Sequence, residues 1–358
     1  MVPLRDRAAH RVTRVALLTE IPAPYRIPLF NALAERVDLR VLFLRKRHEG
    51  HLYDLHPEEM NFDWRVVPGV DVTVRKHWLV LNASVARRLG RADAVILGGW
   101  NQPAFWEAMA WCLVRRVPLV IWAESTALDE RSGRHEPLKR LLLRSATGFI
   151  VPGTASREYL ERLGVPAGRI TVAPNAVDAA IFGSAARTRT NGPCRIIAVA
   201  RLSPEKGLDV LIRAAAGLPA EVVVAGSGPE EDRLRELAGP NVTFLGNVER
   251  DALPQLYADA DIAVVPSRSD TWGMTLNEAA LAGLPLVAST VVGGSRDLIE
   301  EGVNGFRVRP DDPDALRQTL HRLVENEALR RAAGARSRVI AARFTPEAWA
   351  EAVSGAVR

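Results

Sequence analysis

The chain has 358 residues, of which 47% are hydrophobic, and its 47 Lys and Arg against 42 Asp and Glu give a net charge of +5. This length and hydrophobic content predict two domains, each with its own buried core. The two cysteines, Cys112 and Cys194, are too few for a disulfide framework or a cysteine metal site, and no apolar run reaches the roughly 20 residues of a membrane-spanning helix, so we expect a cytoplasmic protein.

Positive charge is concentrated in the first half of the chain. Residues 1–175 hold 26 basic and 18 acidic residues, a balance of +8, whereas residues 176–358 hold 21 and 24, a balance of −3. Two interpretations fit this asymmetry: the first half contacts an acidic ligand or an anionic membrane surface, or its basic pairs are ordinary solvated faces. Nucleic acid is not expected as a partner, because the basic residues are dispersed and no nucleic-acid-binding motif is present.

Short apolar runs alternate with helical stretches through the first half, which predicts a parallel sheet covered by helices. The segment from residue 45 to residue 80 shows no periodicity and is expected to be irregular. The expected strands are residues 14–19, 39–44, 94–97, 119–122, 149–151 and 170–172, and the expected helices are residues 29–36, 104–115, 138–144 and 156–163.

Polar side chains follow the first, third and fourth of these strands. Tyr25 and Arg26 lie in the loop after the first, Asn101 and Gln102 follow the third, and Glu124 follows the fourth. Ligands of open α/β sheets bind beyond the carboxyl ends of the strands. These side chains are therefore candidate ligand contacts.

Two cations follow the first expected strand of the second half. That strand, residues 195–200, leads into Arg201 and, five residues later, Lys206, with Gly207 before a helix. A strand end that delivers two cations can grip a diphosphate from two directions. The alternative is a basic surface loop, but only 4 of the 47 basic residues are Lys, so a Lys at this position is an uncommon choice.

The most informative stretch is residues 262–289, in which a buried strand, a polar loop, a helix and a second strand follow one another. Asp270 lies in the loop, and Glu278 lies about one turn into the helix expected from Thr275 to Ala282. The start of such a helix favours a phosphate, because its N–H groups lack intrahelical partners and its dipole is positive there. Two carboxylates beside a phosphate suit hydroxyl groups, so the stretch describes a site for a nucleotide sugar. The alternative is an ordinary strand–loop–helix unit with two solvated acids.

This stretch resembles the Glu-x7-Glu signature of the retaining family 4 glycosyltransferases, with Asp270 in the first acidic position and Glu278 in the second. Residues 201–208, RLSPEKGL, resemble the family's G-R-L-x-x-x-K-G loop, and residues 226–229 resemble its G-x-G-P turn. The resemblance implies the GT-B fold, an α/β architecture of two Rossmann-like domains whose parallel sheets face each other across a cleft. It assigns acceptor binding to residues 1–176, donor binding to residues 177–344, and a crossing back to the first domain to the C-terminal helix, residues 345–358.

The resemblance also implies roles for individual residues. The expected catalytic residues are Arg201, Lys206, Asp270 and Glu124, the last of which stands where many members have His. The expected donor contacts are Glu278, Gly273, Met274, Thr275, Gly226, Gly228, Val248, Gly293 and Gly294, and the expected acceptor contacts are Tyr25, Arg26, Asn101 and Gln102. No cofactor and no metal are expected, and Asp259-Ala260-Asp261 is interpreted as helix capping or surface charge rather than as a metal site.

Together these features predict an enzyme that moves a sugar from a nucleoside-diphosphate sugar to a hydroxyl group, with retention at the anomeric carbon and without a metal. The acceptor is a glycan, a lipid-linked molecule or a small molecule, and peripheral contact with the inner face of a membrane follows from one of the two interpretations of the basic half. Two alternatives stay open: a non-catalytic partner of another transferase that binds a nucleotide sugar, and a nucleotide-sugar epimerase on the same fold.

Overall fold

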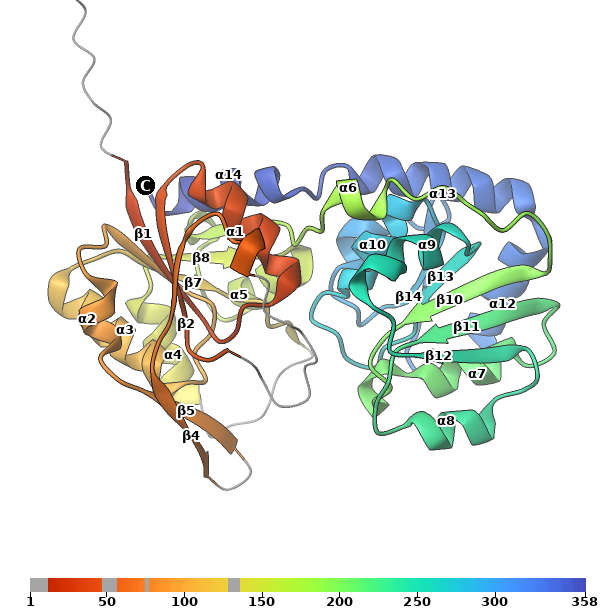
Figure 1. Cartoon of the computed structure of the whole chain (residues 1–358), viewed down its shortest axis with the longest axis horizontal. Helices are drawn as coiled ribbons and strands as arrows, with labels where there is room; N and C mark the ends of the chain where they lie inside the picture. The colour runs from red at the N-terminus through yellow and green to blue at the C-terminus, as the bar shows by residue number, and fades with distance from the viewer. Residues whose placement is uncertain (1–11, 47–56, 75–76, 128–135) are drawn as a thin grey trace, which may run out of the picture. The chain divides into compact units, whose positions relative to one another are not determined.

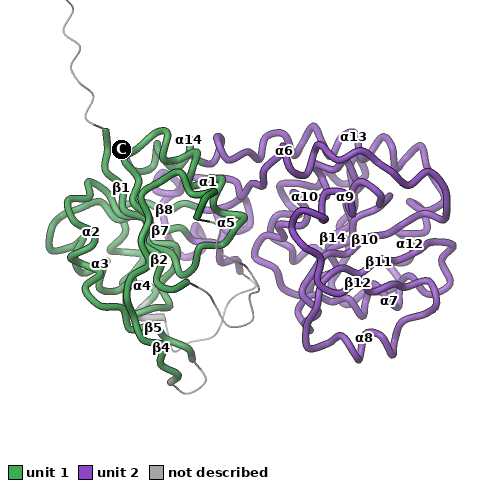
Figure 2. The backbone as a smooth tube through the Cα atoms, in the orientation of Figure 1, with its two compact units in different colours: residues 1–122, 137–150, 350–358 green, residues 123–136, 151–349 purple. Residues whose placement is uncertain are grey.

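The computed structural model of the protein describes residues 12–46, 57–74, 77–127 and 136–358. The chain divides into two compact units (Figure 2). The first unit consists of residues 1–122, 137–150 and 350–358, and the second of residues 123–136 and 151–349. The domain limits predicted after residues 176 and 344 stay predictions.

The first sheet has seven strands in the order β3-β2-β1-β6-β7-β8-β9 (Figure 1). All six strands predicted for the first half are present, and the second and the fifth of them each begin one residue early. β1, β6 and β7 are almost wholly buried, as expected of parallel strands covered on both faces. The strands are β1 (Arg14–Thr19), β2 (Asp38–Phe43), β3 (Asp63–Val66), β6 (Ala94–Leu97), β7 (Leu119–Trp122), β8 (Gly148–Val151) and β9 (Ile170–Val172).

The helices predicted for the first half are present as α1, α3, α4 and α5, and α2 is a short additional helix that was not predicted. α3 begins at Pro103, where the missing N–H of proline removes no helical hydrogen bond, and ends at Arg115, which is followed by Arg116 in a left-handed conformation. The helices are α1 (Ile27–Ala34), α2 (Val85–Leu89), α3 (Pro103–Arg115), α4 (Glu136–Ser145) and α5 (Thr154–Arg162), and the last helix of the chain is α14 (Pro346–Ala356).

The prediction that residues 45–80 are irregular is wrong for the part that the structure describes. Besides β3, the segment forms most of an antiparallel hairpin of β4 (Gly69–Val74) and β5 (His77–Asn82). Asn82 anchors this hairpin, because its side-chain amide donates to the carbonyl oxygens of Leu44 at 2.8 Å and Val67 at 3.1 Å. The strands are short and partly exposed, so hydrophobic periodicity does not reveal them. Residues 47–56 lie outside the described residues.

The sheet of the second unit has six parallel strands in the order β12-β11-β10-β13-β14-β15. Strand order reverses at β10, whose neighbours are β11 on one side and β13 on the other, so the loops after β10 and β13 leave a topological switch point. The strands are β10 (Cys194–Val199), β11 (Ala220–Ala225), β12 (Val242–Gly246), β13 (Ile262–Val265), β14 (Leu286–Ser289) and β15 (Gly305–Val308).

Helices cover both faces of this sheet. Figure 1 shows α7 and α12 on one face and α9, α10 and α13 on the other. The helices are α6 (Ala179–Phe182), α7 (Leu208–Ala215), α8 (Glu231–Leu237), α9 (Leu253–Ala258), α10 (Met274–Ala282), α11 (Ser295–Leu298), α12 (Pro313–Glu325) and α13 (Glu327–Ala341).

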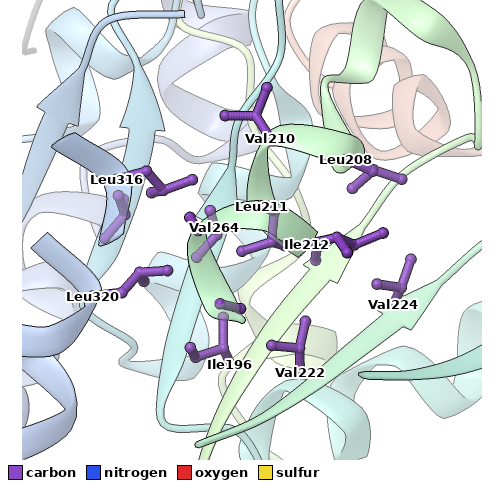
Figure 3. Packing of buried hydrophobic residues seen from close by; sticks show 14 of the residues in the cluster. Ile196, Leu208, Val210, Leu211, Ile212, Val222, Val224, Val264, Leu316 and Leu320 are labelled. Atoms are coloured by element: carbon purple, nitrogen blue, oxygen red, sulfur yellow. The ribbon is translucent and has the colours of Figure 1, made fainter. Parts of the chain in front are cut away.

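The two cores of the second unit follow from the alternation of side chains along each strand. Ile196 packs with Leu211 of α7 and Leu316 of α12 on one face (Figure 3). Ile197, the next residue, packs with Leu276 of α10 on the other. Each fully buried side chain of this kind contributes about 1.5–3 kcal/mol of transfer free energy. Across the part of the chain that the structure describes, none of the helices has the length and apolar character needed to span a bilayer.

Gly334 allows α13 to pass close to the turn that follows α10. A Cβ atom at this position would lie 2.0 Å from the carbonyl oxygen of Gly283, a backbone atom that cannot rotate away. We expect Gly334→Ala to lower the free energy of unfolding by about 1–3 kcal/mol, because the two elements must separate. The effect opposes the gain of about 1 kcal/mol that alanine gives in an ordinary helix. Urea denaturation monitored by circular dichroism measures the difference.

Gly355 in α14 provides the matched control. No heavy atom lies within 4 Å of the Cβ atom that alanine would add there. Gly355→Ala should therefore leave stability unchanged or raise it by up to about 1 kcal/mol. Equal losses in the two variants would contradict the packing argument.

Candidate active site

Two loops leave the sheet of the second unit side by side, because β10 and β13 are neighbours. The loop after β10 carries Arg201 and Lys206, and the loop after β13 carries Asp270. Backbone hydrogen bonds join the loops, since the N–H groups of Arg268 and Ser269 donate to the carbonyl oxygen of Glu205 at 2.8 and 3.3 Å. The predicted residues thus lie where a parallel sheet presents its ligand site.

Lys206 and Asp270 form an ion pair across the two loops. The Nζ atom of Lys206 lies 2.7 Å from Oδ2 of Asp270, and the two side chains are 25% and 15% exposed. The second oxygen of Asp270 accepts a hydrogen bond from the N–H of Trp272 at 3.3 Å. Lys206 and Asp270 belong to separate sequence motifs that were predicted to form one site, and their side chains are in direct contact.

Arg201 lies at the surface beside this pair. Its side chain is 53% exposed, and Nη2 lies 3.0 Å from Oε1 of Glu205, which also accepts from the hydroxyl of Ser203 at 2.6 Å. Burial alone would raise the pKa of Glu205, but the hydrogen bonds from Ser203 and Arg201 outweigh it and hold this pKa below its usual value. An exposed pair of this kind is worth about 0–1 kcal/mol, so Arg201 can exchange its partner for an incoming anion at little cost.

Arg268 fixes the loop after β13 in place. Its guanidinium donates to both carboxylate oxygens of Asp209, each at 2.9 Å, and to the carbonyl oxygen of Pro204 at 2.7 Å. Burial would raise the pKa of Asp209, but the bidentate contact with Arg268 keeps it below the usual value. The sequence did not predict this ion pair of Arg268 with Asp209, because the two residues are 59 positions apart and neither lies in a recognisable motif.

The predicted glycines lie where backbones touch. A Cβ atom on Gly226, which has φ of +133°, would lie 1.9 Å from the carbonyl oxygen of Ala200, and one on Gly293 would lie 2.0 Å from that of Thr271. Both partners belong to the loops after β10 and β13. The four predicted glycines that pack in this way are Gly226, Gly228, Gly293 and Gly294. Because these glycines have no side chain, the segments that contain them can pack directly against the loops after β10 and β13.

Helix α10 begins beside Asp270, one residue earlier than predicted. Gly273 precedes it with φ of +84°, and Met274 and Thr275 are its first two residues. Glu278 lies one turn in, half-buried, and its Oε2 accepts a hydrogen bond from the hydroxyl of Tyr257 at 2.7 Å. Burial raises the pKa of Glu278 and the Tyr257 hydroxyl opposes that rise, while burial and the charge of Glu278 raise the pKa of Tyr257 well above its usual value.

A buried polar chain supports the first turns of α10. The ring N–H of Trp272 donates to Oδ1 of Asn277 at 2.7 Å, and the amide of Asn277 donates to the carbonyl oxygen of Asn175 at 3.0 Å. Trp272 and Asn277 are buried. Sequence reasoning missed this chain as well, although an Asn on the buried face of a predicted helix is a signal that a partner is needed.

Two other predicted residues lie outside the ion pair. Glu124 is near the end of β9, where its Oε1 accepts from the amide of Asn175 at 3.4 Å and its carbonyl oxygen accepts from the hydroxyl of Ser156 at 3.2 Å. Val248 is half-buried and follows β12 by two residues. These positions do not test the catalytic role predicted for Glu124 or the donor contact predicted for Val248.

The residues predicted to bind the acceptor lie in the first unit, and two of them meet at Glu20. Its Oε1 accepts from the side-chain amides of Asn101 at 2.7 Å and Gln102 at 3.2 Å, and its Oε2 lies 3.3 Å from Nη2 of Arg45. Gln102 is 2% exposed and accepts from the N–H of Val80 at 2.8 Å. The sequence analysis gave Glu20 no role, although a carboxylate one residue beyond a buried strand lies where ligands of parallel sheets bind and is therefore a candidate ligand contact.

Tyr25 and Arg26 belong to a cation–π group at the ends of β1 and β7. The guanidinium carbon of Arg26 lies 4.5 Å from the ring centre of Trp122 and 5.6 Å from that of Tyr25. Nη1 of Arg26 donates to the hydroxyl of Thr19 at 3.3 Å. The cation is therefore held at Thr19, the residue before Glu20 in the chain.

Asp259, of the segment Asp259-Ala260-Asp261, directly follows α9, and its carboxylate and that of Asp261 bind backbone N–H groups of residues 188–195 rather than a helix end. The carboxylate of Asp259 accepts from the N–H groups of Thr188 at 2.7 Å and Arg189 at 2.8 Å, and Asp261 accepts from the N–H of Arg195 at 2.8 Å. Burial is the largest single influence on the pKa of Asp259 and raises it, but the hydrogen bonds from Gln255, Arg189 and Thr188 together outweigh it and hold this pKa well below its usual value. Both carboxylates are thus occupied by backbone donors.

Comparison with known families matches both halves of the chain. The family model described as "Glycosyl transferases group 1" matches residues 185–339, and the model described as "Glycosyltransferase Family 4" matches residues 29–181. The first match contains the loops after β10 and β13.

Two curated relatives carry the same name, D-inositol 3-phosphate glycosyltransferase. The protein from Salinispora arenicola is 32% identical over 321 residues, which cover 77% of this chain and 70% of the relative. The protein from Mycolicibacterium gilvum is 40% identical over 171 residues, which cover 43% of this chain and only 38% of the relative.

Solved structures share the fold. Anabaena HepE in complex with UDP and glucose has a TM-score of 0.76 at 21% identity, over 96% of this chain and 98% of that chain. Sucrose-phosphate synthase from Thermosynechococcus elongatus has a TM-score of 0.74 at 19% identity, over 96% and 98%. These likenesses confirm the predicted GT-B class.

The raised pKa of Glu278 predicts a pH-dependent cost to stability. A carboxyl group whose pKa is higher in the folded than in the unfolded protein stabilises the fold below its unfolded pKa, and this contribution is lost as pH rises through the folded pKa. Glu278→Gln should therefore melt at a higher temperature than the wild type at neutral pH, with a smaller loss of stability on going from acid to neutral pH. Thermal unfolding from about pH 4 to about pH 7.5 measures both.

Glu236→Gln is the control, because Glu236 is exposed on α8 of the same unit. Its pH profile should coincide with that of the wild type. A Glu278→Gln profile that also coincides with the wild type would show that the half-buried carboxylate of Glu278 carries no such cost.

Proposed function

The chain belongs to the family 4 glycosyltransferases of the GT-B fold class, and we propose that it transfers a sugar from a nucleoside-diphosphate sugar to a hydroxyl group of an acceptor. The observation that carries the proposal is the ion pair between Lys206 and Asp270 at the switch point of the second sheet. It brings a cation suited to a phosphate and a carboxylate suited to a sugar hydroxyl within 2.7 Å of each other.

The cations stabilise the leaving group. When the bond between sugar and phosphate breaks, negative charge develops on the diphosphate. In this proposal that charge is received by Lys206 and Arg201, which belong to the loop after β10, and by the first N–H groups of α10, which follows the neighbouring loop. Donors that are already in place stabilise a transition state more than donors that must reorganise, which is the usual source of the largest catalytic effect.

The carboxylates orient the donor. Binding of a diphosphate draws Lys206 away from Asp270, and the freed carboxylate accepts hydrogen bonds from hydroxyls of the transferred sugar. Glu278, which Tyr257 already holds by one oxygen, binds the ribose with the other. Lys206 thus exchanges Asp270 for a ligand anion, and the hydroxyl groups of the sugar replace Lys206 as the donors to Asp270.

We also propose that the anomeric configuration is retained and that no metal takes part. Retention is supported by membership in a family that the sequence motifs identify as retaining. The supply of positive charge by Arg201 and Lys206 supports metal independence, because these two cations can neutralise a diphosphate by themselves.

The acceptor is proposed to bind in the first unit, at the cluster formed by Glu20, Asn101 and Gln102. A carboxylate with two amides is suited to orienting a hydroxyl group.

Peripheral contact with the cytoplasmic face of a membrane is supported by Val114, which is 81% exposed next to Arg115 and Arg116 at the end of α3.

We expect Lys206→Ala to reduce kcat by a factor of hundreds, about 3–4 kcal/mol of barrier, while the protein stays folded. The loss follows from removal of a preorganised donor at the diphosphate. Transfer and donor hydrolysis are measured with a panel of nucleotide sugars, and circular dichroism reports on the fold.

Arg213→Ala is the control, since Arg213 is exposed in α7, the helix that follows Lys206. It should keep wild-type kcat. Wild-type turnover in Lys206→Ala would refute the assignment. Donor binding without any turnover would identify a non-catalytic partner, and recovery of an epimerised sugar would identify an epimerase.

A second prediction concerns Asp270. The carboxylate of glutamate reaches farther by one methylene, and a displacement near 1 Å can change a rate by about a hundredfold. Asp270→Glu should therefore change the ranking of nucleotide-sugar donors, measured as kcat/KM across the panel. An unchanged ranking would show that Asp270 does not select the sugar.

A further inference from the structure

Tyr257 is a fully buried tyrosine whose hydroxyl group meets a carboxylate. It lies in α9, which packs with α10 on one face of the second sheet (Figure 1). Its ring contacts that of Phe182 edge to face, with 6.1 Å between the ring centres. The hydroxyl donates to Oε2 of Glu278 at 2.7 Å, and no other side-chain hydrogen bond of Tyr257 is formed within the described residues.

Glu278 therefore has one oxygen bound and one oxygen open. Tyr257 occupies Oε2, whereas Oε1 accepts no hydrogen bond from the part of the chain that the structure describes. Oε1 is the accessible oxygen of this half-buried side chain. A carboxylate in partly apolar surroundings is stabilised by each donor that reaches it, and a single phenol hydroxyl supplies only one. The open oxygen thus favours a ligand that brings a hydroxyl group.

The hydrogen bond from Tyr257 also fixes the direction of the open oxygen. The last side-chain torsion of a glutamate has little intrinsic preference, so an unanchored carboxylate turns freely. The anchor at Oε2 removes this freedom. It is itself held in place, because Tyr257 belongs to a core cluster with Phe182, Val265 and Leu276. A ligand hydroxyl therefore meets an acceptor that is already aimed, and the cost of ordering it is avoided.

The charge of Glu278 limits which part of a nucleotide can meet Oε1. Like charges repel, so a phosphate group is a poor partner, whereas a hydroxyl group donates to the oxygen. The ribose of a ribonucleotide carries hydroxyl groups at its 2′ and 3′ carbons, and a 2′-deoxyribose lacks the first of them. A site built to bind a hydroxyl group rejects the analogue that lacks it, because the oxygen of the protein is then left unpaired.

We propose that Tyr257 is a positioning residue that makes the donor site selective for ribonucleotides, an inference that rests on the proposed function. Tyr257 holds Oε2 of Glu278, and Oε1 accepts a hydrogen bond from the 2′-hydroxyl of the donor. The donor is accordingly a ribonucleoside-diphosphate sugar, and sugars carried by 2′-deoxyribonucleotides bind weakly.

Calorimetric titration of the full-length protein with matched nucleotides tests the proposal. UDP, GDP and ADP are compared with dUDP, dGDP and dADP, and the base that binds most tightly is then used for the variants. The wild type should bind the ribonucleotide about 10- to 100-fold more tightly than its 2′-deoxy counterpart, since one hydrogen bond to a charged group is lost. Equal affinities would overturn the proposal.

Tyr257→Phe keeps the buried ring and removes the anchor. It should weaken binding of the ribonucleotide about tenfold and leave binding of the 2′-deoxy counterpart nearly unchanged. In transfer assays the KM for the donor should rise while kcat stays at the wild-type value, because the ribose contact is the same in the ground and transition states. An equal loss for both nucleotides would indicate a purely structural role, and unchanged selectivity would show no role. Either result contradicts the assignment.

Tyr159→Phe is the matched control. Tyr159 is also buried and belongs to the same unit, but it lies in α5, with its ring centre 5.9 Å from the guanidinium carbon of Arg162. Removal of its hydroxyl group should leave the preference for the ribonucleotide at the wild-type value. Circular dichroism of both variants reports on the fold.

Lys206→Ala separates this inference from the proposed function. It should weaken both nucleotides by the same factor, because Lys206 is proposed to act on the diphosphate that they share. Wild-type affinities in Lys206→Ala would count against the proposed function while the selectivity for ribose stands. If no nucleoside diphosphate binds the wild type, the proposed function and this inference both fail.

Discussion

The carbonyl oxygen of Glu205 is the point at which the candidate active site is assembled. Two consecutive N–H groups of the loop after β13 donate to it, and Arg268 ties the same loops together from the side through Asp209 and Pro204. Lys206 follows Glu205 directly, and Asp270 lies two residues beyond Arg268. The contact between a cation and a carboxylate from separate motifs is therefore fixed by backbone geometry, and the side chains only complete it.

Charge in this site is balanced within the protein before any ligand binds. Arg201 has Glu205, Lys206 has Asp270 and Arg268 has Asp209. The first two pairs are partly exposed, so an anion can replace the carboxylate, whereas Asp209 is 7% exposed and its pair is structural. Exposure thus separates the cations that can meet a ligand from the one that holds the loop.

The sequence predicted what depends on local pattern. The strand Ile262–Val265, the loop with Asp270 and the helix with Glu278 were found within one residue, because apolar runs and helix formers determine them. It could not predict contacts between positions that are far apart in the sequence, such as the ion pair of Arg268 with Asp209 or the hydrogen bond from Asn277 to Asn175. Such contacts depend on the tertiary fold, and no local sequence pattern indicates which residue is the partner. The hairpin of β4 and β5 was missed for a different reason, since short and partly exposed strands leave little hydrophobic periodicity. The roles of the predicted residues remain proposals.

The convergence of three donors on Glu20 limits how the first unit can diversify. The carboxylate of Glu20 orients Asn101, Gln102 and Arg45, and Gln102 in turn accepts a hydrogen bond from the N–H of Val80 in β5. Replacing Glu20 alone would remove a shared partner from all three side chains together, while replacing one of the amides would leave Oε1 of Glu20 with a single amide donor. Directed evolution of this surface toward new substrates would therefore advance through coordinated multi-site libraries, and single-site saturation would sample mostly misassembled variants.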